Sequence, residues 1–319
     1  MTRFDGAIAP IAVTTRSGFE ESVHHGAGVA VAASGEATAT VGDADLVVYP
    51  RSSLKPMQAH AMVAAGLELP DELLAVACAS HDGADVHLDA VRAILDRFDL
   101  VESDLQNTPT RPLDSAARTA AREAGIGPSS LQQNCSGKHA AMLATCRVNG
   151  WSIDTYLDVD HPLQQAITAG FERLGCTVHH IGIDGCGAPT HALSLSGLAG
   201  AFSTIATDGT PVARSMRANP VLVAGLARDT TRWMQAVPGL MTKDGADGVM
   251  AGALADGRSF AYKIADGSDL ARESVMSEAM SRLGVDVAGL APDLLSHPVL
   301  GHGREVGQVR ALEWVPCSS

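Results

Sequence analysis

The chain has 319 residues, 46% of them apolar and 18% charged, and its 23 basic and 36 acidic residues give a net charge of −13. This composition is typical of a globular protein with a sizeable core and excludes a disordered chain. The acidity argues against partners that are nucleic acids or anionic membranes, because both are bound through basic groups. No secretory leader and no run of about 18 apolar residues is visible, so we expect a cytoplasmic protein.

Strand patterns cluster near both ends of the chain, and helical patterns lie between them. The expected strands are 7–14, 22–33, 37–41, 46–49, 177–183, 249–254, 259–264 and 305–312. The expected helices are 57–65, 70–79, 87–98, one capped by Asp114 and ended by Gly125, 139–149, 160–175, one after Pro189, one opened by Pro220, and 269–283. Residues 103–113 and 243–248 are expected to be loops.

This order of elements predicts an α/β (α+β layered) fold. An antiparallel sheet built from both chain ends and flanked by helices fits the order better than a doubly wound sheet does. No internal repeat, linker or domain boundary is visible. We therefore expect a single domain over residues 1–319, with a helical central region at roughly 56–235 that packs on the terminal sheet.

A Ser-x-x-Lys segment lies where an extended run ends and a helix begins. Ser52 and Lys55 are three residues apart, so one helical turn brings the hydroxyl and the amine onto the same face. A serine needs a base to become a nucleophile, and a desolvated lysine can be that base. The alternative is a helix-start serine that satisfies backbone N–H groups. Ser53 lacks this spacing and is expected to be structural, whereas Arg51 is a candidate to hold a carboxylate.

Six short motifs near element ends together resemble one family. They are Arg-Ser-x-x-Lys-Pro-x-Gln-Ala at 51–59, Ala-Ser-His at 79–81, Asn-Cys-Ser-Gly-Lys-His at 134–139, Asp-Gly-Cys-Gly-Ala-Pro at 184–189, Gly-Ala-Asp-Gly-Val at 245–249 and Lys-Ile-Ala-Asp-Gly at 263–267. The chain thereby resembles the Rhizobium-etli-type L-asparaginases (asparaginase II family) over roughly residues 7–310. These enzymes are unrelated to the threonine-based bacterial asparaginases.

The resemblance implies a fold similar to the serine β-lactamases and glutaminases. It also implies a homodimeric amidohydrolase that converts L-asparagine to L-aspartate and ammonia through two Ser–Lys pairs. Matched motif to motif, Ser52 is the nucleophile with Lys55 as its partner, and Ser80 pairs with Lys263. Without the resemblance, Ser80 would be a polar residue at a helix end and Lys263 a solvated strand residue. Together, neighbouring positive charges would lower the pKa of each lysine.

The resemblance further implies a Zn²⁺ ion held by Cys135, Lys138 and Cys186. Ligand chemistry alone favours His139 over Lys138, because lysine coordinates only when it is neutral and is not a usual zinc ligand. His139 lies four residues after Cys135, which is also suitable spacing. Two buried thiols without a metal are the remaining alternative.

Two further features bear on the substrate. Arg51 is a candidate for its α-carboxylate, and Asp184 for its α-amino group or for orienting a metal ligand. Residues 107–110 read Asn-Thr-Pro-Thr where related sequences carry Cys-Gly-x-His. This departure leaves open what the 103–113 loop contributes to the site and to the substrate range.

Two other functions remain open at this point. One is a glutaminase, β-lactamase, peptidase or other serine hydrolase on the same fold, because asparagine and glutamine differ by one methylene, worth only about 1–3 kcal/mol of discrimination. The other is a non-catalytic zinc-binding or amino-acid-binding protein. Only an enzyme would combine binding with release of ammonia.

Overall fold

The structure is a computed structural model that describes residues 2–317. The chain divides into two compact units. The first unit comprises Met1–Ser53, Ala192–Thr207 and Arg232–Ser319, and the second comprises Leu54–His191 and Asp208–Thr231. The expectation of one domain over residues 1–319 stays a prediction.

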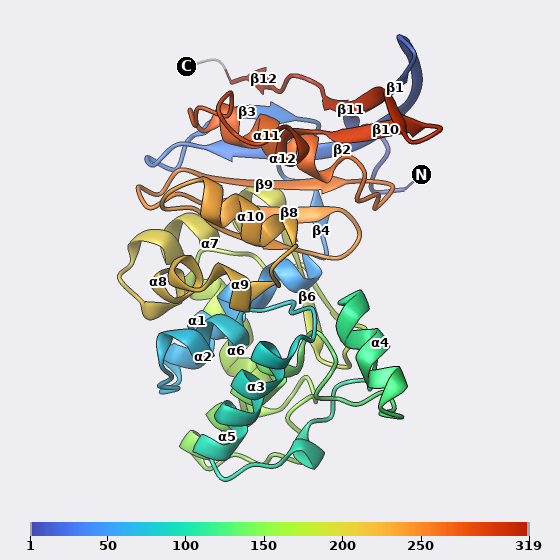
Figure 1. The fold of residues 1–319 in the computed structure, drawn as a ribbon. Coiled ribbons are helices and arrows are strands. Elements are labelled where there is room, and N and C mark those ends of the chain that lie inside the picture. The colour runs from blue at the N-terminus through green and yellow to red at the C-terminus, as the bar shows by residue number, and fades with distance from the viewer. Residues whose placement is uncertain (1, 318–319) are drawn as a thin grey trace. The chain divides into compact units, whose positions relative to one another are not determined.

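The first unit contains a nine-stranded antiparallel sheet in the order β10-β11-β1-β2-β9-β8-β7, with β3 and β12 extending from β2. The strands are β1 (Ala9–Arg16), β2 (Phe19–Val31), β3 (Ala37–Val41), β7 (Met241–Asp244), β8 (Val249–Ala253), β9 (Ser259–Ile264), β10 (His297–Gly301), β11 (Arg304–Ala311) and β12 (Val315–Pro316). The strands come from both chain ends, as the sequence predicts, and the mixed α/β class with an antiparallel sheet and helices is confirmed (Figure 1).

Alternation along β9 separates the core of the first unit from its candidate site. Phe260, Tyr262 and Ile264 belong to the main apolar cluster, which also contains the buried Trp314. Because successive side chains of a strand point to opposite faces, Lys263 lies on the other face. The helices of this unit are α7 (Leu195–Thr207), which packs on β2, β8 and β9, and α11 (Arg272–Arg282), which packs on β1, β2 and β11, together with α12 (Pro292–Leu295). Helix α10 (Asp229–Ala236) belongs to this unit from Arg232 onward.

The second unit is mainly helical, and its central helix is α5 (Ser136–Asn149), which is buried from Ser136 to Cys146. The other helices are α1 (Lys55–Ala64), α2 (Asp71–Ala77), α3 (Asp85–Arg97), α4 (Ser115–Glu123), α6 (Pro162–Arg173), α8 (Pro211–Ala218) and α9 (Pro220–Val223). Asp114 caps α4 as expected, since its Oδ1 accepts a hydrogen bond from the Ala117 N–H at 2.7 Å. Gly150 ends α5 with φ 66°, a left-handed conformation that glycine adopts without strain.

The chain also contains several short elements. They are β4 (Val47–Val48), the 3₁₀ helices η1 (Arg51–Leu54) and η2 (Glu102–Asp104), β5 (His180–Ile183) and β6 (Pro189–Ser194). Strand β4 pairs with the end of β6, Val47 opposite Ser194 and Val48 opposite Leu193. No helix within residues 2–317 is both long enough and apolar enough to span a membrane.

Several elements differ from the sequence prediction. Residues 241–244 form the edge strand β7 rather than the start of a loop, and β6 and β10 were not predicted. These strands have no clear periodicity, because each has only four to six residues and carries charged, proline or histidine residues. Strand β6 pairs with β4, which is distant in the sequence, whereas β7 and β10 pair with the adjacent strands β8 and β11. In each case pairing rather than local preference decides the conformation.

The aromatic core of the first unit should control its stability. Trp314→Ala removes a fully buried ring from the main apolar cluster and should lower the free energy of unfolding by about 3–5 kcal/mol. Phe19→Ala is the control, because Phe19 is 76% exposed and its loss should change stability by no more than about 0.5 kcal/mol. Urea denaturation of both variants measures the loss of unfolding free energy. Equal losses would contradict the assignment of Trp314 to the core.

Candidate active site

The turn that carries Ser52 belongs to the first unit. Arg51 begins η1 with φ 54°, a left-handed conformation that costs a non-glycine residue about 1–3 kcal/mol. The Arg51 guanidinium Nη1 lies 2.9 Å from Asp247 Oδ2. Ser52 is half-buried, whereas Ser53 is fully buried and its hydroxyl donates to the Lys243 carbonyl at 2.8 Å. The fold itself therefore uses the Ser53 hydroxyl.

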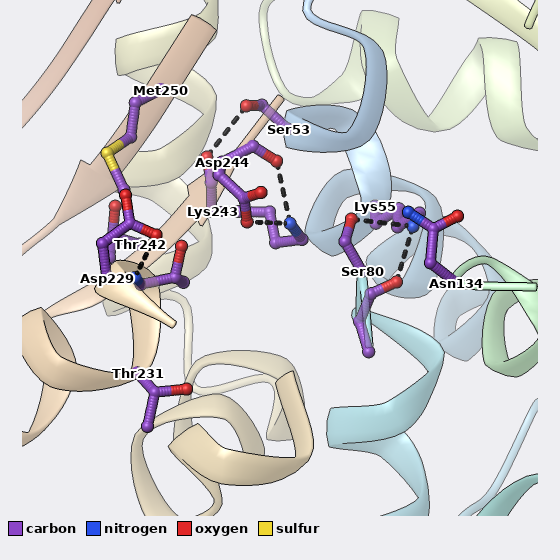
Figure 2. A network of polar contacts seen from close by, with 12 residues as sticks. Ser53, Lys55, Ser80, Asn134, Asp229, Thr231, Thr242, Lys243, Asp244 and Met250 are labelled. Carbon is purple, nitrogen blue, oxygen red and sulfur yellow. Dashed lines mark hydrogen bonds and ion pairs between the residues drawn. The ribbon is translucent and has the colours of Figure 1, made fainter. Parts of the chain in front are cut away.

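Lys243 is a candidate that the sequence analysis missed. Its side chain is 0% exposed, and Nζ donates to the Asp244 carboxylate at 2.5 Å and to the Asp244 carbonyl at 2.8 Å (Figure 2). The next residue, Gly245, lies so close to the Ser52 turn that a Cβ there would come within 2.2 Å of the Pro50 carbonyl oxygen. A buried ion pair thus ends β7 directly against the turn that holds the expected nucleophile.

A signal for Lys243 was present in the sequence. The chain contains only four lysines, at positions 55, 138, 243 and 263. Lysine is normally a surface residue, yet all four lysines of this chain are buried. The scarcity of lysine therefore marks each remaining one as a residue with a partner.

Lys263 lies on β9, opposite Ala27 of β2 and Val249 of β8. Its Nζ donates a hydrogen bond to the Asp247 carbonyl. Burial lowers the pKa of Lys263 below its usual value and Arg51 acts in the same direction, while Asp247 and Asp266 oppose the shift. The neutral amine, which a general base requires, is thereby favoured.

The second unit brings Lys55 and Ser80 together. Lys55 opens α1 and is buried, and its Nζ donates to the Ser80 hydroxyl at 3.0 Å and to the Ala79 carbonyl at 2.6 Å (Figure 2). The sequence analysis did not predict this contact. The assignments of Lys55 to Ser52 and of Lys263 to Ser80 each join residues of different units, and they stay predictions.

The residues that follow Ser80 help to fix its position. The Ser80 N–H donates to the Val223 carbonyl at 3.0 Å. His81 is fully buried, and its Nε2 lies 2.8 Å from the Ser136 hydroxyl at the start of α5. The His81 ring also stacks on that of His87, with the ring centroids 5.2 Å apart. Ser80 therefore sits on a backbone held from two sides.

Both expected cysteine ligands and Lys138 meet in the second unit. Lys138 Nζ lies 3.1 Å from Cys186 Sγ, and the thiols of Cys135 and Cys186 share a hydrogen bond. This bond lowers the pKa of Cys135 well below its usual value, and the positive charges of Lys55 and Lys138 help it to outweigh burial. The same bond and burial raise the pKa of Cys186. One thiolate is thereby stabilised beside an ammonium group.

Opposing influences act on the pKa of Lys138. Burial alone would lower its pKa, but the charges of Cys186, Cys135 and Asp184 outweigh burial and raise it. Asp184 also shapes the turn before Cys186, because its Oδ1 accepts from the Gly185 N–H at 2.7 Å. The charge of Asp184 therefore acts on Lys138, and its expected roles toward a metal ligand or the substrate stay predictions.

His139 does not join this cluster. Its Nδ1 lies 2.8 Å from the Tyr156 hydroxyl, and burial, followed by Lys138 and Lys55, holds its pKa well below the usual value. No group of three or more His, Cys, Asp or Glu side chains in the described chain is arranged to hold a metal ion. In the structure His139 Nδ1 faces Tyr156 rather than the two cysteines, and the choice between His139 and Lys138 as a third ligand stays a prediction. The donors that remain together are two sulfurs and the Lys138 amine.

The 103–113 loop borders the two cysteines despite its departure from the family pattern. Asn107 is buried and donates to Gln133 Oε1 at 3.0 Å, and the same oxygen accepts from the Cys135 N–H at 2.9 Å. The Thr108 hydroxyl donates to the carbonyl of Gly185, next to Cys186, at 3.0 Å. The loop therefore supports both halves of the thiol pair through hydrogen bonds rather than through ligands of its own.

Comparison with known proteins agrees with this chemistry. The family model described as L-asparaginase II matches residues 12–311, which is nearly the whole chain. A search of curated proteins found no match. The chain belongs to the L-asparaginase II family. It is accordingly an asparaginase-type hydrolase, as the motifs predicted.

The buried pair of Lys243 and Asp244 gives a stability prediction. Lys243→Ala leaves the Asp244 carboxylate buried without its closest cation and should lower the free energy of unfolding by about 3–5 kcal/mol. Arg92→Ala is the control, since it breaks only exposed ion pairs with Asp89 and Glu102 and should cost at most about 1 kcal/mol. Urea unfolding compares the two variants. A loss for Lys243→Ala no larger than the control's would refute the structural importance of the pair.

Proposed function

We propose that the protein hydrolyses L-asparagine to L-aspartate and ammonia through an acyl-enzyme on Ser52. The proposal extends the family assignment to the Rhizobium-etli-type enzymes and to a fold similar to the serine β-lactamases and glutaminases. The observation that carries it is Lys55, a buried lysine that follows Ser52 by three residues and contacts the Ser80 hydroxyl. Such a lysine is shielded from water and within reach of a hydroxyl, as an amine base must be.

In the first step, the Ser52 oxygen attacks the side-chain amide carbon of asparagine, and Lys55 in its neutral form accepts the hydroxyl proton. Backbone N–H groups stabilise the resulting oxyanion, and one such donor typically contributes about 3–4 kcal/mol. The tetrahedral intermediate collapses as the C–N bond breaks. Lys55 returns the serine proton to the leaving nitrogen, which departs as ammonia, and a β-aspartyl ester remains on Ser52.

In the second step, water hydrolyses this ester. Ser80 lies 3.0 Å from Lys55 Nζ, so its hydroxyl is suited to pass a proton to or from that amine. Lys263 is the expected second base, and its lowered pKa supports that role. Attack by hydroxide on the ester carbon breaks the bond to Ser52 Oγ, which regains its proton as L-aspartate leaves.

Two charged residues are proposed to select an amino-acid substrate. The Arg51 guanidinium would hold the α-carboxylate, because its planar donors match a carboxylate. Asp184 would attract the α-ammonium group in addition to its effect on Lys138. We extend the proposal to a homodimer, as the family resemblance implies.

The proposed zinc ion would be held by Cys135, Cys186 and Lys138. The donor set fits, because two thiol sulfurs are the ligands that zinc prefers and the amine lies 3.1 Å from one of them. Metal binding would require Lys138 to lose a proton, although the neighbouring thiols raise its pKa. When bound, the ion would orient the substrate or polarise a water molecule.

An assay of ammonia release over asparagine, glutamine and related amides tests the activity. Wild-type protein should act on asparagine, Ser52→Ala should be inactive, and Lys55→Met should lower kcat about 100- to 10,000-fold as expected for loss of a general base. Ser53→Ala is the matched control, because its hydroxyl is bonded to the Lys243 carbonyl, and it should retain most activity. No ammonia from asparagine would refute the proposal, and preference for glutamine would indicate the alternative hydrolase.

Metal analysis of the purified protein tests the zinc site. Native protein should contain about one zinc per chain, and Cys135→Ala should lose it because one of two sulfur ligands is removed. Cys146→Ala is the control, since Cys146 is a buried thiol in α5, the helix that follows Cys135, and burial alone raises its pKa to about 12. A zinc content near zero in the native protein would exclude the site.

A further inference from the structure

Asp247 contacts two groups to which the proposed function gives roles. It lies in the loop of residues 245–248 that joins β7 to β8. Its Oδ2 is 2.9 Å from Arg51 Nη1, and its backbone carbonyl accepts the hydrogen bond from Lys263 Nζ. One residue therefore touches the cation proposed for the substrate carboxylate and the lysine proposed as second base.

The backbone of Asp247 is held firmly. Its φ of 58° is left-handed, a region in which aspartate is enriched among non-glycine residues. Gly248, with φ 74°, packs so closely that a Cβ there would come within 2.8 Å of the Ile264 carbonyl oxygen. A Cβ on Gly267 would lie 3.3 Å from the Asp247 Cα. The carbonyl that receives Lys263 is thus fixed by the backbone alone.

The side chain of Asp247 is in a different situation. It is 69% exposed, although it is paired with the half-buried Arg51 guanidinium. Water screens such an exposed ion pair, so the carboxylate can leave Arg51 at little cost in free energy. An incoming carboxylate has the same charge and the same geometry for a guanidinium. A substrate carboxylate can therefore take the place of the Asp247 carboxylate at the Arg51 guanidinium.

We propose that Asp247 is a positioning residue that holds Arg51 in place until the α-carboxylate of the substrate displaces its side chain. The inference rests on the proposed function, which gives Arg51 that ligand. The exchange makes binding depend on a carboxylate, because an amide without one leaves Arg51 paired with Asp247. It also makes the substrate and the product L-aspartate compete with the protein's own carboxylate for one guanidinium.

Kinetics of Asp247→Asn and Asp247→Gly test the exchange, since both replacement residues tolerate a positive φ. Each variant should lower KM for asparagine and Ki for L-aspartate by about two- to fivefold, the range that an exposed ion pair gives. The kcat should not fall by more than about twofold, because the carbonyl bound by Lys263 is retained and loss of the Asp247 charge shifts the pKa of Lys263 further toward the neutral amine.

Asp256→Asn is the matched control. Asp256 is 52% exposed and its Oδ2 lies 2.7 Å from Arg258 in a hairpin turn of the same unit, so its loss should leave KM unchanged. If KM for Asp247→Asn equals that of the control or rises, or if only kcat falls, the exchange is refuted. These outcomes require an active wild type, whereas a wild type that releases no ammonia from asparagine refutes the proposed function itself.

Discussion

The burial of every lysine in the chain is the constraint on which the candidate site depends. Lys55, Lys138, Lys243 and Lys263 are between 0% and 8% exposed. A buried ammonium group without partners is strongly destabilising, so it must be hydrogen-bonded, paired with an anion, or neutral. The structure supplies a different solution to each lysine. Lys55 has a hydroxyl and a carbonyl, Lys138 two thiols, Lys243 a carboxylate and Lys263 a carbonyl.

The partners of the four lysines suggest which lysines are structural and which are suited to catalysis. The ion pair with Asp244 compensates the charge of Lys243. The backbone carbonyl of Lys243 accepts a hydrogen bond from Ser53 and so helps to hold the turn that carries Ser52. Lys263 donates to a neutral carbonyl oxygen, and burial lowers its pKa below the usual value, which favours the neutral amine that a base needs. Lys55 donates to the Ser80 hydroxyl and the Ala79 carbonyl, and it also interacts with the Cys135 thiol.

Much of the fold could be predicted from the sequence, and the reasons are local. The alternation in β2, β8 and β9 and the turn residues between them predict a sheet from both chain ends, which the structure confirms. Asp114 was recognisable as a helix cap because capping depends on nearby atoms alone. Strand β7 was not predicted, because its four residues become a strand only through pairing with β8.

The candidate site could be predicted as a set of residues but not as a set of contacts. Sequence spacing suggested that Lys55 serves Ser52, yet the described bonds of Lys55 run to residues 79 and 80, which belong to a different element. Spacing also made His139 a candidate ligand, but the direction of its ring depends on Tyr156, which no local pattern reveals. Such contacts arise from packing between distant segments, where short motifs carry no information.

The identity of the acylated serine tests the central claim most directly. An asparagine analogue with a diazoketone in place of its side-chain amide should alkylate the activated nucleophile. Peptide mass spectrometry should then place the adduct on Ser52, three residues before the buried Lys55. An adduct on Ser80, the hydroxyl that Lys55 contacts, or on Ser53 would contradict the account, because the nucleophile would then be a different residue.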